Sequence, residues 1–326
     1  MQTTDGSPVL EQEPSAEVLG RQAAPEVAGR SPTFITDLLR TIRPRQWVKN
    51  GFVVIPAVFG GALHTPQLLR IGLGVLAFCL VSSGLYVIND VADRDADRLH
   101  ARKRQRPIAA GRMSIPGAIV CAVLLMAGGA GLAALVNLDT LAIIGLYVAL
   151  TLAYSAWLKR LVIIDVIVLA SGFVLRVAAG ATAISIVPSE WLLLCTLFLA
   201  LFLGFGKRYH ELILLGETAG DHRRVLQRYT ESTLTQFLNA SMLGTLFSYC
   251  LYTFFSPTAV NHRGLMVTIP FAVYGVFRYM LLMETRRDGG APEEVILQDR
   301  PMQLTALLWI AVAALVLYGP QIGIGA

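Results

Sequence analysis

Uncharged stretches alternate with short charged segments along the chain from about residue 50 onward. Each uncharged stretch approaches or reaches the roughly 20 residues that a helix needs to cross the ~30 Å hydrocarbon core of a bilayer. The first stretch is interrupted by Pro56, Gly60 and Gly61. The pattern predicts an all-α, polytopic membrane protein with about nine transmembrane helices in one bundle. These helices are expected at residues 51–69, 71–88, 115–136, 140–157, 161–183, 190–206, 234–255, 265–283 and 303–322.

The composition agrees with this class, because 55% of the residues are hydrophobic and only 15% are charged. An average soluble domain carries about 25% charged residues. The first 30 residues differ from the rest, since they are polar and rich in Pro, Gly and Ala, which is typical of a disordered segment. We therefore predict a disordered cytoplasmic tail at residues 1–34 and a single transmembrane catalytic domain at residues 35–326.

Positive charge is distributed unevenly between the two sets of connections. Of the 27 Lys and Arg residues, 23 lie in the tail or after the second, fourth, sixth and eighth predicted helices, and only 2 lie in the opposite connections. Cytoplasmic loops hold Lys and Arg in excess. The asymmetry predicts a multi-pass protein of the cell membrane whose amino terminus faces the cytoplasm and whose carboxyl terminus lies outside.

The most unusual segment is "NDVADRDADRLHARKRQR", which spans residues 89–106 at the end of the second predicted helix. If that helix continues, Asn89, Asp93 and Asp97 share one face, with Asp90 beside them. Carboxylates this close repel one another unless a cation lies among them. Mg²⁺ prefers such oxygen ligands and completes its coordination with water and substrate phosphate. The alternative is a solvated segment at the membrane edge, whose acids pair with the nearby arginines.

These residues resemble the first aspartate motif, NDxxDxxxD, of the UbiA superfamily of intramembrane prenyltransferases. The motif is matched by Asn89, Asp90, Asp93 and Asp97, and a second family element, a Tyr and a Lys, is matched in "YSAWLK" by Tyr154 and Lys159. The resemblance implies a nine-helix bundle with a cytoplasmic active site. It also implies that Mg²⁺ is held by the three aspartates, which with Lys159 form the catalytic set.

One family element is absent. Most members carry a second DxxxD motif after the sixth helix, whereas this chain has "GKRYHE", with Lys207, Arg208 and Glu211. This departure resembles the phosphoribosyltransferase branch of the superfamily. The branch implies Mg²⁺-dependent transfer of 5-phosphoribose from phosphoribosyl pyrophosphate (PRPP) to a polyprenyl (decaprenyl) phosphate, with release of pyrophosphate; in actinobacteria the product leads to cell-wall arabinan. The other matching segments are "RPRQWVKN" (43–50), "KRQRPIAAG" (103–111) and "DVIVLASGFVLR" (165–176).

PRPP carries a diphosphate on C1 and a separate phosphate on C5, so its site requires a metal cluster and a second anion pocket. We assign the diphosphate to the aspartates through Mg²⁺, with Asn89 as a hydrogen-bonding neighbour. Lys207 and Arg208 are the expected ligands of the 5-phosphate, and Glu211 would orient Lys207 from the next helical turn.

Further basic residues lie on the cytoplasmic segments. Lys103, Arg104 and Arg106 can reach the diphosphate or the 5-phosphate, although positive-inside charge or binding of anionic lipid explains them as well. Gln46 and Lys49 are candidates for the phosphate of the lipid acceptor, and the alternative for them is ordinary anchoring at the membrane interface.

The fifth predicted helix carries an acid and a base within the membrane. Asp165 and Arg176 are 11 residues apart, which is about three turns and nearly one face, so they either pair structurally or line the cavity. Lys159 is expected to contact substrate with Tyr154. The segment "SGFVLRVAAGATA" (171–183) offers small residues that allow close helix packing or leave an apolar groove for the lipid tail.

Two other functions compete with phosphoribosyl transfer. The first is transfer of a prenyl diphosphate to an aromatic or other small acceptor, against which the missing second DxxxD motif argues. The second is transport, which predicts charged residues along a path rather than at one mouth. The expected partners are PRPP, a polyprenyl phosphate and the bilayer, with no nucleic acid, and the sequence is compatible with a homo-oligomer.

Overall fold

The computed structural model describes residues 34–63, 65–100, 103–215, 224–286, 295 and 298–319, and this part of the chain is helical without a strand. The tail predicted at residues 1–34 lies outside it apart from Phe34, which begins α1. The α-helices are α1 (Phe34–Ile42), α2 (Ile55–Phe59), α3 (Thr65–Ala92), α4 (Arg94–Leu99), α5 (Ile115–Val136), α6 (Leu138–Ala156), α7 (Ile164–Ala183), α8 (Glu190–Leu215), α10 (Glu231–Phe255), α11 (Pro257–Asn261), α12 (Ile269–Arg286) and α14 (Arg300–Tyr318). The 3₁₀ helices are η1 (Pro44–Val53), η2 (Lys103–Gln105), η3 (Leu158–Arg160), η5 (Arg224–Arg228) and η6 (Arg263–Thr268).

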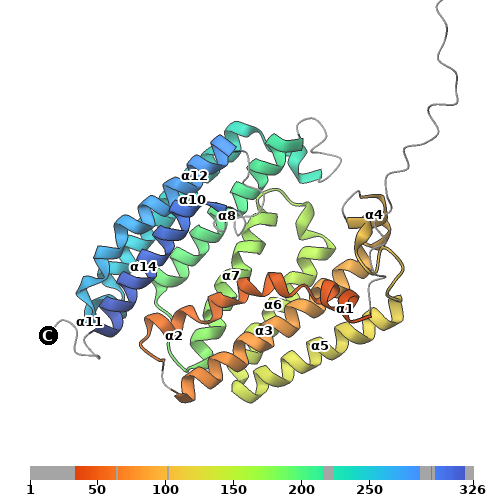
Figure 1. Ribbon diagram of the computed structural model, residues 1–326, viewed down its shortest axis with the longest axis horizontal. Helices are drawn as coiled ribbons and strands as arrows, with labels where there is room; N and C mark the ends of the chain where they lie inside the picture. The colour runs from red at the N-terminus through yellow and green to blue at the C-terminus, as the bar shows by residue number, and fades with distance from the viewer. Residues whose placement is uncertain are drawn as a thin grey trace, which may run out of the picture.

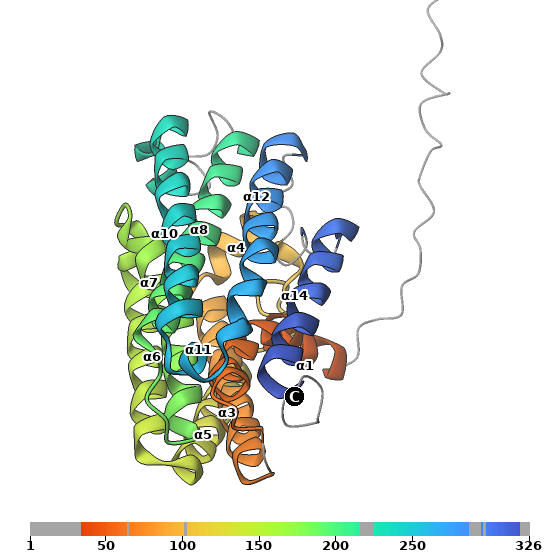
Figure 2. The same ribbon diagram turned by 90° about the vertical axis from the view of Figure 1, so that its left-hand side faces the viewer.

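The long helices form one bundle, as Figures 1 and 2 show. Helix α3 packs along α5, and α8 packs along α10. Glycines allow the close approach of α3 and α5, because a Cβ on Gly129 would lie 2.8 Å from the Ala77 carbonyl oxygen, and one on Gly84 would lie 3.0 Å from that of Ala122. Small residues at such contacts are typical of helices that pack within membranes.

The predicted all-α membrane fold is confirmed, but the count of nine spanning helices is not. Among the described residues, seven helices are long and apolar enough to cross a membrane. Helix α10 is not one of them although it has 25 residues, and its buried face includes Ser241, Thr245 and Ser248.

The first predicted helix, at 51–69, is wrong as a continuous element. The structure has the end of η1, the five-residue α2, a turn at Gly61 with φ of 66°, and then the start of α3. Helix α7 covers this irregular segment closely, because a Cβ on Gly180 would lie only 2.0 Å from the Val53 carbonyl oxygen. The small residues predicted to permit close packing therefore do so here.

The ends of several helices gather at one end of the bundle. Contacts between side chains join Asp93, just after α3, to η3, and the start of α7 to α8 and to Tyr229, just after η5. Figure 1 shows the last turns of α3, α6 and α8 on the same side of the bundle. At the opposite end, Asn137 before α6 donates to the Thr182 carbonyl near the end of α7. The motifs from "NDVADRD", "YSAWLK" and "GKRYHE" therefore meet at one end, as the charge asymmetry predicts.

Candidate active site

The predicted row of acids is present at the end of α3. Helix α3 extends to Ala92, beyond the predicted end at residue 88, and α4 follows after a turn at Asp93. The Asp93 amide donates to the Asn89 carbonyl (2.9 Å) and the Asp97 amide to the Asp93 carbonyl (2.8 Å). These bonds keep the spacing of four residues across the turn, so the acids share one side as predicted.

Each acid of the row is paired with a base. One nitrogen of Arg106, Nη1, donates to Asp90 Oδ1 at 3.0 Å and to Asp97 Oδ2 at 2.5 Å. Lys159 Nζ lies 3.4 Å from Asp93 Oδ1, and Lys103 Nζ lies 4.0 Å from Asp97 Oδ1. The pairing of acids with arginines, the alternative to a metal site, is therefore present. It includes three residues predicted to contact substrate, Lys103, Arg106 and Lys159.

Arg43 is a further member of this cluster that the sequence did not single out. Its guanidinium donates to Asp90 Oδ1 and lies 5.2 Å from the centre of the Tyr86 ring. Its backbone is left-handed, with φ of 53°, which is uncommon for a residue other than glycine. No signal in the sequence indicates this role, because the contact of Arg43 with Asp90 spans 47 residues.

The donor atoms of the cluster suit Mg²⁺. Two carboxylates converge on the single Arg106 nitrogen, at a point where a cation is already favoured. Asn89 Oδ1 is buried without a hydrogen-bond partner, and such an oxygen is a suitable ligand for a hard cation. As placed, no three His, Cys, Asp or Glu side chains of the described segments are grouped to hold a metal. Binding there requires the arginine to release the carboxylates.

A cavity of about 190 Å³ lies beside this cluster, between η1, α3, α6 and α7. Asn89 belongs to both the cluster and the cavity. The structure brings four predicted residues together here: Lys49, Asn89, Tyr154 and Arg176. Other polar lining residues are Ser82, Tyr86, Tyr147, Thr151 and Ser155.

Arg176 is buried in the wall of this cavity, with 5% of its surface exposed. Its Nε donates to Asn50 Oδ1 (2.9 Å), Nη1 to the Gly172 carbonyl (2.8 Å) and Nη2 to the Tyr147 hydroxyl (2.9 Å). Of the two possibilities for Asp165 and Arg176, the structure favours cavity lining for Arg176, because Asp165 bonds Arg208 instead.

Arg208 and Glu211 do not form an open phosphate site. Arg208 is 1% exposed; its Nε donates to Asp165 Oδ2 and its Nη1 to Glu211 Oε2, both at 2.8 Å. This burial does not favour the predicted contact of Arg208 with a 5-phosphate, which stays a prediction, and Glu211 bonds Arg208. The sequence missed Asp165 as the counterion because it lies 43 residues away.

Tyr229 extends this buried network to the loop before α10. Its hydroxyl accepts from the Ile163 amide (2.7 Å) and donates to Asp165 Oδ1 (3.4 Å). Burial raises the pKa of Tyr229 to about 12, so the hydroxyl keeps the proton that it donates. Ile163 has a positive φ of 70°, which is strained for a β-branched residue. The network therefore stabilises the turn between η3 and α7.

The remaining predicted residues are more open. Lys207 is exposed on α8, and Lys103 and Arg104 are exposed on η2. Gln46 is half-buried on η1 and is not part of the cavity wall. The structure leaves these four near the same end of the bundle without joining them to the cavity.

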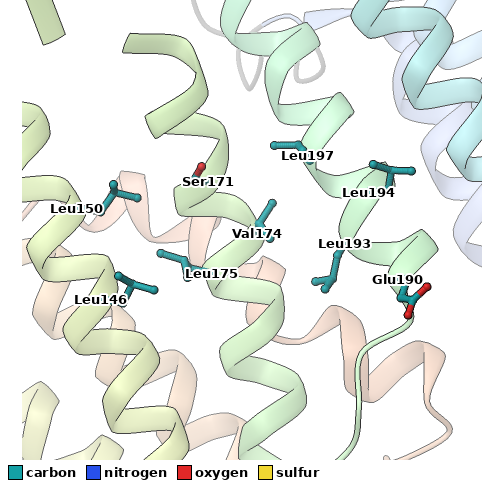
Figure 3. Close-up of a pocket in the computed structure, with 9 residues that line it drawn as sticks. All are labelled: Leu146, Leu150, Ser171, Val174, Leu175, Glu190, Leu193, Leu194 and Leu197. Atoms are coloured by element: carbon teal, nitrogen blue, oxygen red, sulfur yellow. The ribbon is translucent and has the colours of Figure 1, made fainter. Parts of the chain in front are cut away.

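A larger apolar groove of about 580 Å³ lies between α6, α7 and α8. Figure 3 shows its lining, which comprises Leu146, Leu150, Ser171, Val174, Leu175, Glu190, Leu193, Leu194 and Leu197. Leu150 lines both this groove and the polar cavity. The two spaces therefore adjoin at Leu150 on α6.

A helical membrane bundle with an acid cluster beside a cation-lined cavity defines the class of intramembrane transferases that act on phosphorylated substrates. The sequence matches the UbiA prenyltransferase family over residues 52–307, and the chain belongs to this family.

Similar proteins agree with this membership. The chain is 35% identical to the decaprenyl-phosphate phosphoribosyltransferase of Corynebacterium glutamicum, over 86% of each chain. It is 32% identical to the protein of the same name from Mycolicibacterium smegmatis, over 91% of this chain and 97% of the other. The structure of a UbiA homologue from Archaeoglobus fulgidus bound to GPP and Mg²⁺ has the same fold, with a TM-score of 0.66 and 22% identity over 86% of this chain and 99% of that one.

Proposed function

We propose that this membrane transferase moves 5-phosphoribose from PRPP to a polyprenyl phosphate and releases pyrophosphate. The observation that carries the proposal is the junction of an acid cluster with a cation-lined cavity at Asn89. It agrees with the names of the relatives, which match this chain along most of their length. The natural length of the prenyl chain stays open, with decaprenyl phosphate as the first acceptor to test, and arabinan precursor synthesis is the process that the product would enter.

The acid cluster is the proposed site of the diphosphate. Bound by Asp90, Asp93 and Asp97, Mg²⁺ would neutralise negative charge on the pyrophosphate. Arg43 and Arg106 already lie against Asp90. Turning toward the leaving group, they would stabilise the charge that develops on it as its bond to C1 lengthens. Lys159, beside Asp93, would add a third cation.

The acceptor phosphate requires no general base, because it is ionised before it attacks. It approaches C1 from the face opposite the leaving pyrophosphate, so the α-diphosphate becomes a β-phosphodiester. Lys49 in the cavity wall is the proposed contact for a substrate phosphate. Lys207, exposed at the same end of the bundle, remains the proposed contact of the 5-phosphate on that side, without Arg208.

The apolar groove is the proposed path of the polyprenyl chain. Its lining is almost wholly aliphatic, and Leu150 separates it from the polar cavity. A chain that lies in the groove keeps its isoprene units out of water while its phosphate reaches the cavity. With the basic loops at one end of the bundle, we propose that the reaction takes place on the cytoplasmic side of the membrane.

The proposal is tested with purified protein in detergent, labelled PRPP, Mg²⁺ and polyprenyl phosphate. We expect label in the lipid fraction, dependent on both the lipid phosphate and the divalent cation. A parallel reaction supplies a labelled prenyl diphosphate and a small aromatic acceptor. Turnover of the prenyl diphosphate together with no use of PRPP would reject phosphoribosyl transfer in favour of prenyl transfer.

A further inference from the structure

Arg176 is a buried cation that the described residues do not neutralise. Its three bonded partners are an amide oxygen, a backbone carbonyl and a hydroxyl, from Asn50, Gly172 and Tyr147. None of the described carboxylates forms an ion pair with it. Asp165, the acid on the same helix, bonds Arg208 instead. A buried charge is costly unless it is paired, so this arrangement lacks an anion.

The surroundings hold the guanidinium in place without supplying that anion. The rings of Tyr147, Phe173 and Phe78 lie 4.8, 5.4 and 5.7 Å from its central carbon. Aromatic faces stabilise a guanidinium but leave its net charge. Arginine has five N–H donors, and these three hydrogen bonds leave two of them for an incoming acceptor. The same side chain lines the cavity of about 190 Å³, together with Lys49.

We infer that Arg176 is a binding residue for a substrate phosphate in this cavity. The inference rests on the proposed function and deepens it, because it assigns an anion subsite separate from the acid cluster. The phosphate is either the 5-phosphate of PRPP or the phosphate of the polyprenyl acceptor, which share their chemistry. Bidentate contact from a fixed guanidinium suits either one.

Asn50 offers a substitution that neutralises Arg176 without removing it. Asn50 is 1% exposed, and its Oδ1 accepts from Arg176 Nε at 2.9 Å. Asn50→Asp keeps the shape of the side chain and places a carboxylate on the guanidinium. The internal ion pair lowers the charge available to a phosphate, although the substitution also removes the hydrogen bonds that Asn50 Nδ2 donates to Cys79 Sγ (3.3 Å) and Ser82 Oγ (3.4 Å). Arg176→Gln reaches the same neutral state by the opposite route, and Asn261→Asp, exposed on α11, is the matched control.

The experiment measures two properties of each full-length variant in detergent. The first is the protection against thermal unfolding that PRPP or polyprenyl phosphate gives when added alone. The second is the apparent KM for each substrate, with ribose 1-pyrophosphate as the analogue that lacks the 5-phosphate. We expect Asn50→Asp and Arg176→Gln to raise the apparent KM for one substrate by about 10- to 100-fold, the size typical of a lost charge-assisted contact. Asn261→Asp should change the apparent KM for neither substrate.

The pattern of losses identifies the phosphate. A rise in KM for PRPP, with less discrimination against ribose 1-pyrophosphate, assigns the 5-phosphate, whereas a rise for the lipid alone assigns the acceptor. Unchanged KM and protection for both substrates in either folded variant would overturn the inference. Failure of the proposed function gives a different result, because the parent protein itself would then not use PRPP. The kinetics of the variants would in that case be measured with a prenyl diphosphate as substrate.

Discussion

Lys207 and Arg208 are adjacent in the chain, yet the structure predicts opposite consequences for their removal. Arg208 is buried between Asp165 and Glu211, at 2.8 Å from each, whereas Lys207 is exposed. Arg208→Ala should therefore destabilise the protein. Lys207→Ala should leave its stability unchanged and weaken PRPP binding.

The magnitude for Arg208 follows from its burial. The side chains of Arg208 and Asp165 are 2% and 0% exposed, so solvent does not screen their interaction. Removing one partner of a buried pair typically costs about 3–5 kcal/mol, because the other charge stays buried without a partner. For Lys207, loss of one charge-assisted contact to the 5-phosphate is worth about 1.5–3 kcal/mol, or roughly a 10- to 150-fold loss of PRPP affinity.

Thermal unfolding in detergent and PRPP kinetics separate the two effects. Arg208→Ala should lower the Tm by more than about 5 °C. A cycle with Asp165→Asn, Arg208→Gln and the double variant measures the coupling, which should be about 1–3 kcal/mol for residues in direct contact. The double variant should be more stable than the sum of the single changes indicates, since it removes both buried charges together and leaves only the partly exposed Glu211 without its partner.

The opposite result would refute this reasoning. If Arg208→Ala keeps the Tm of the parent but raises the KM for PRPP, the side chain binds substrate and the buried ion pair is not its role. If Lys207→Ala weakens binding of the lipid acceptor and not of PRPP, then Lys207 contacts the lipid phosphate and the 5-phosphate lies elsewhere.

Three other predictions test the acids, the groove and the orientation. Asp93→Asn should abolish turnover and leave a folded membrane protein, because it removes charge from the proposed metal site; near-normal activity with the same Mg²⁺ dependence would count against that site. Leu194→Trp should raise the KM for a long polyprenyl phosphate more than the KM for a short-chain one. The control Val123→Trp, exposed on α5, should change neither KM, and equal effects of the two substitutions would show that the groove does not bind the acceptor. In a protein without native cysteines, Ser114→Cys should react with an impermeant thiol reagent from the cytoplasmic side and Asn261→Cys from outside, and labelling of both from one side would refute the orientation.

Hydropathy predicted the long helices because their residues are apolar over the whole length needed to cross a membrane. It failed for residues 51–69, where the average is apolar but local geometry decides the structure. A break before α2, which has Pro56 in its first turn, and the turn at Gly61 divide this segment into the end of η1, α2 and the start of α3. The close fit of Val53 against Gly180 supports the irregular backbone, and no count of apolar residues contains that contact.

The acid row was predictable because its members are close in sequence, and helical spacing fixes their relative positions. The pairing of these acids with Arg106 could also be predicted, as the alternative to a metal site, because Arg106 is close to them in the sequence. Arg43 was not predictable, since its contact with Asp90 spans 47 residues and depends on a left-handed backbone. Long-range contacts of this kind follow from packing rather than from spacing.

Counterions distinguish the roles of three buried or partly buried arginines that look alike in the sequence. Arg208 is neutralised by acids that stay with it, so its charge serves the fold. Arg106 pairs with two acids of the proposed metal site, Asp90 and Asp97. A bound cation would compete with Arg106 for these acids, and a bound diphosphate would compete with the acids for Arg106. Arg176 is surrounded by neutral groups in a cavity wall. Burial makes an unpaired charge costly. Of the three arginines, Arg176 is therefore the one whose charge a substrate phosphate would neutralise.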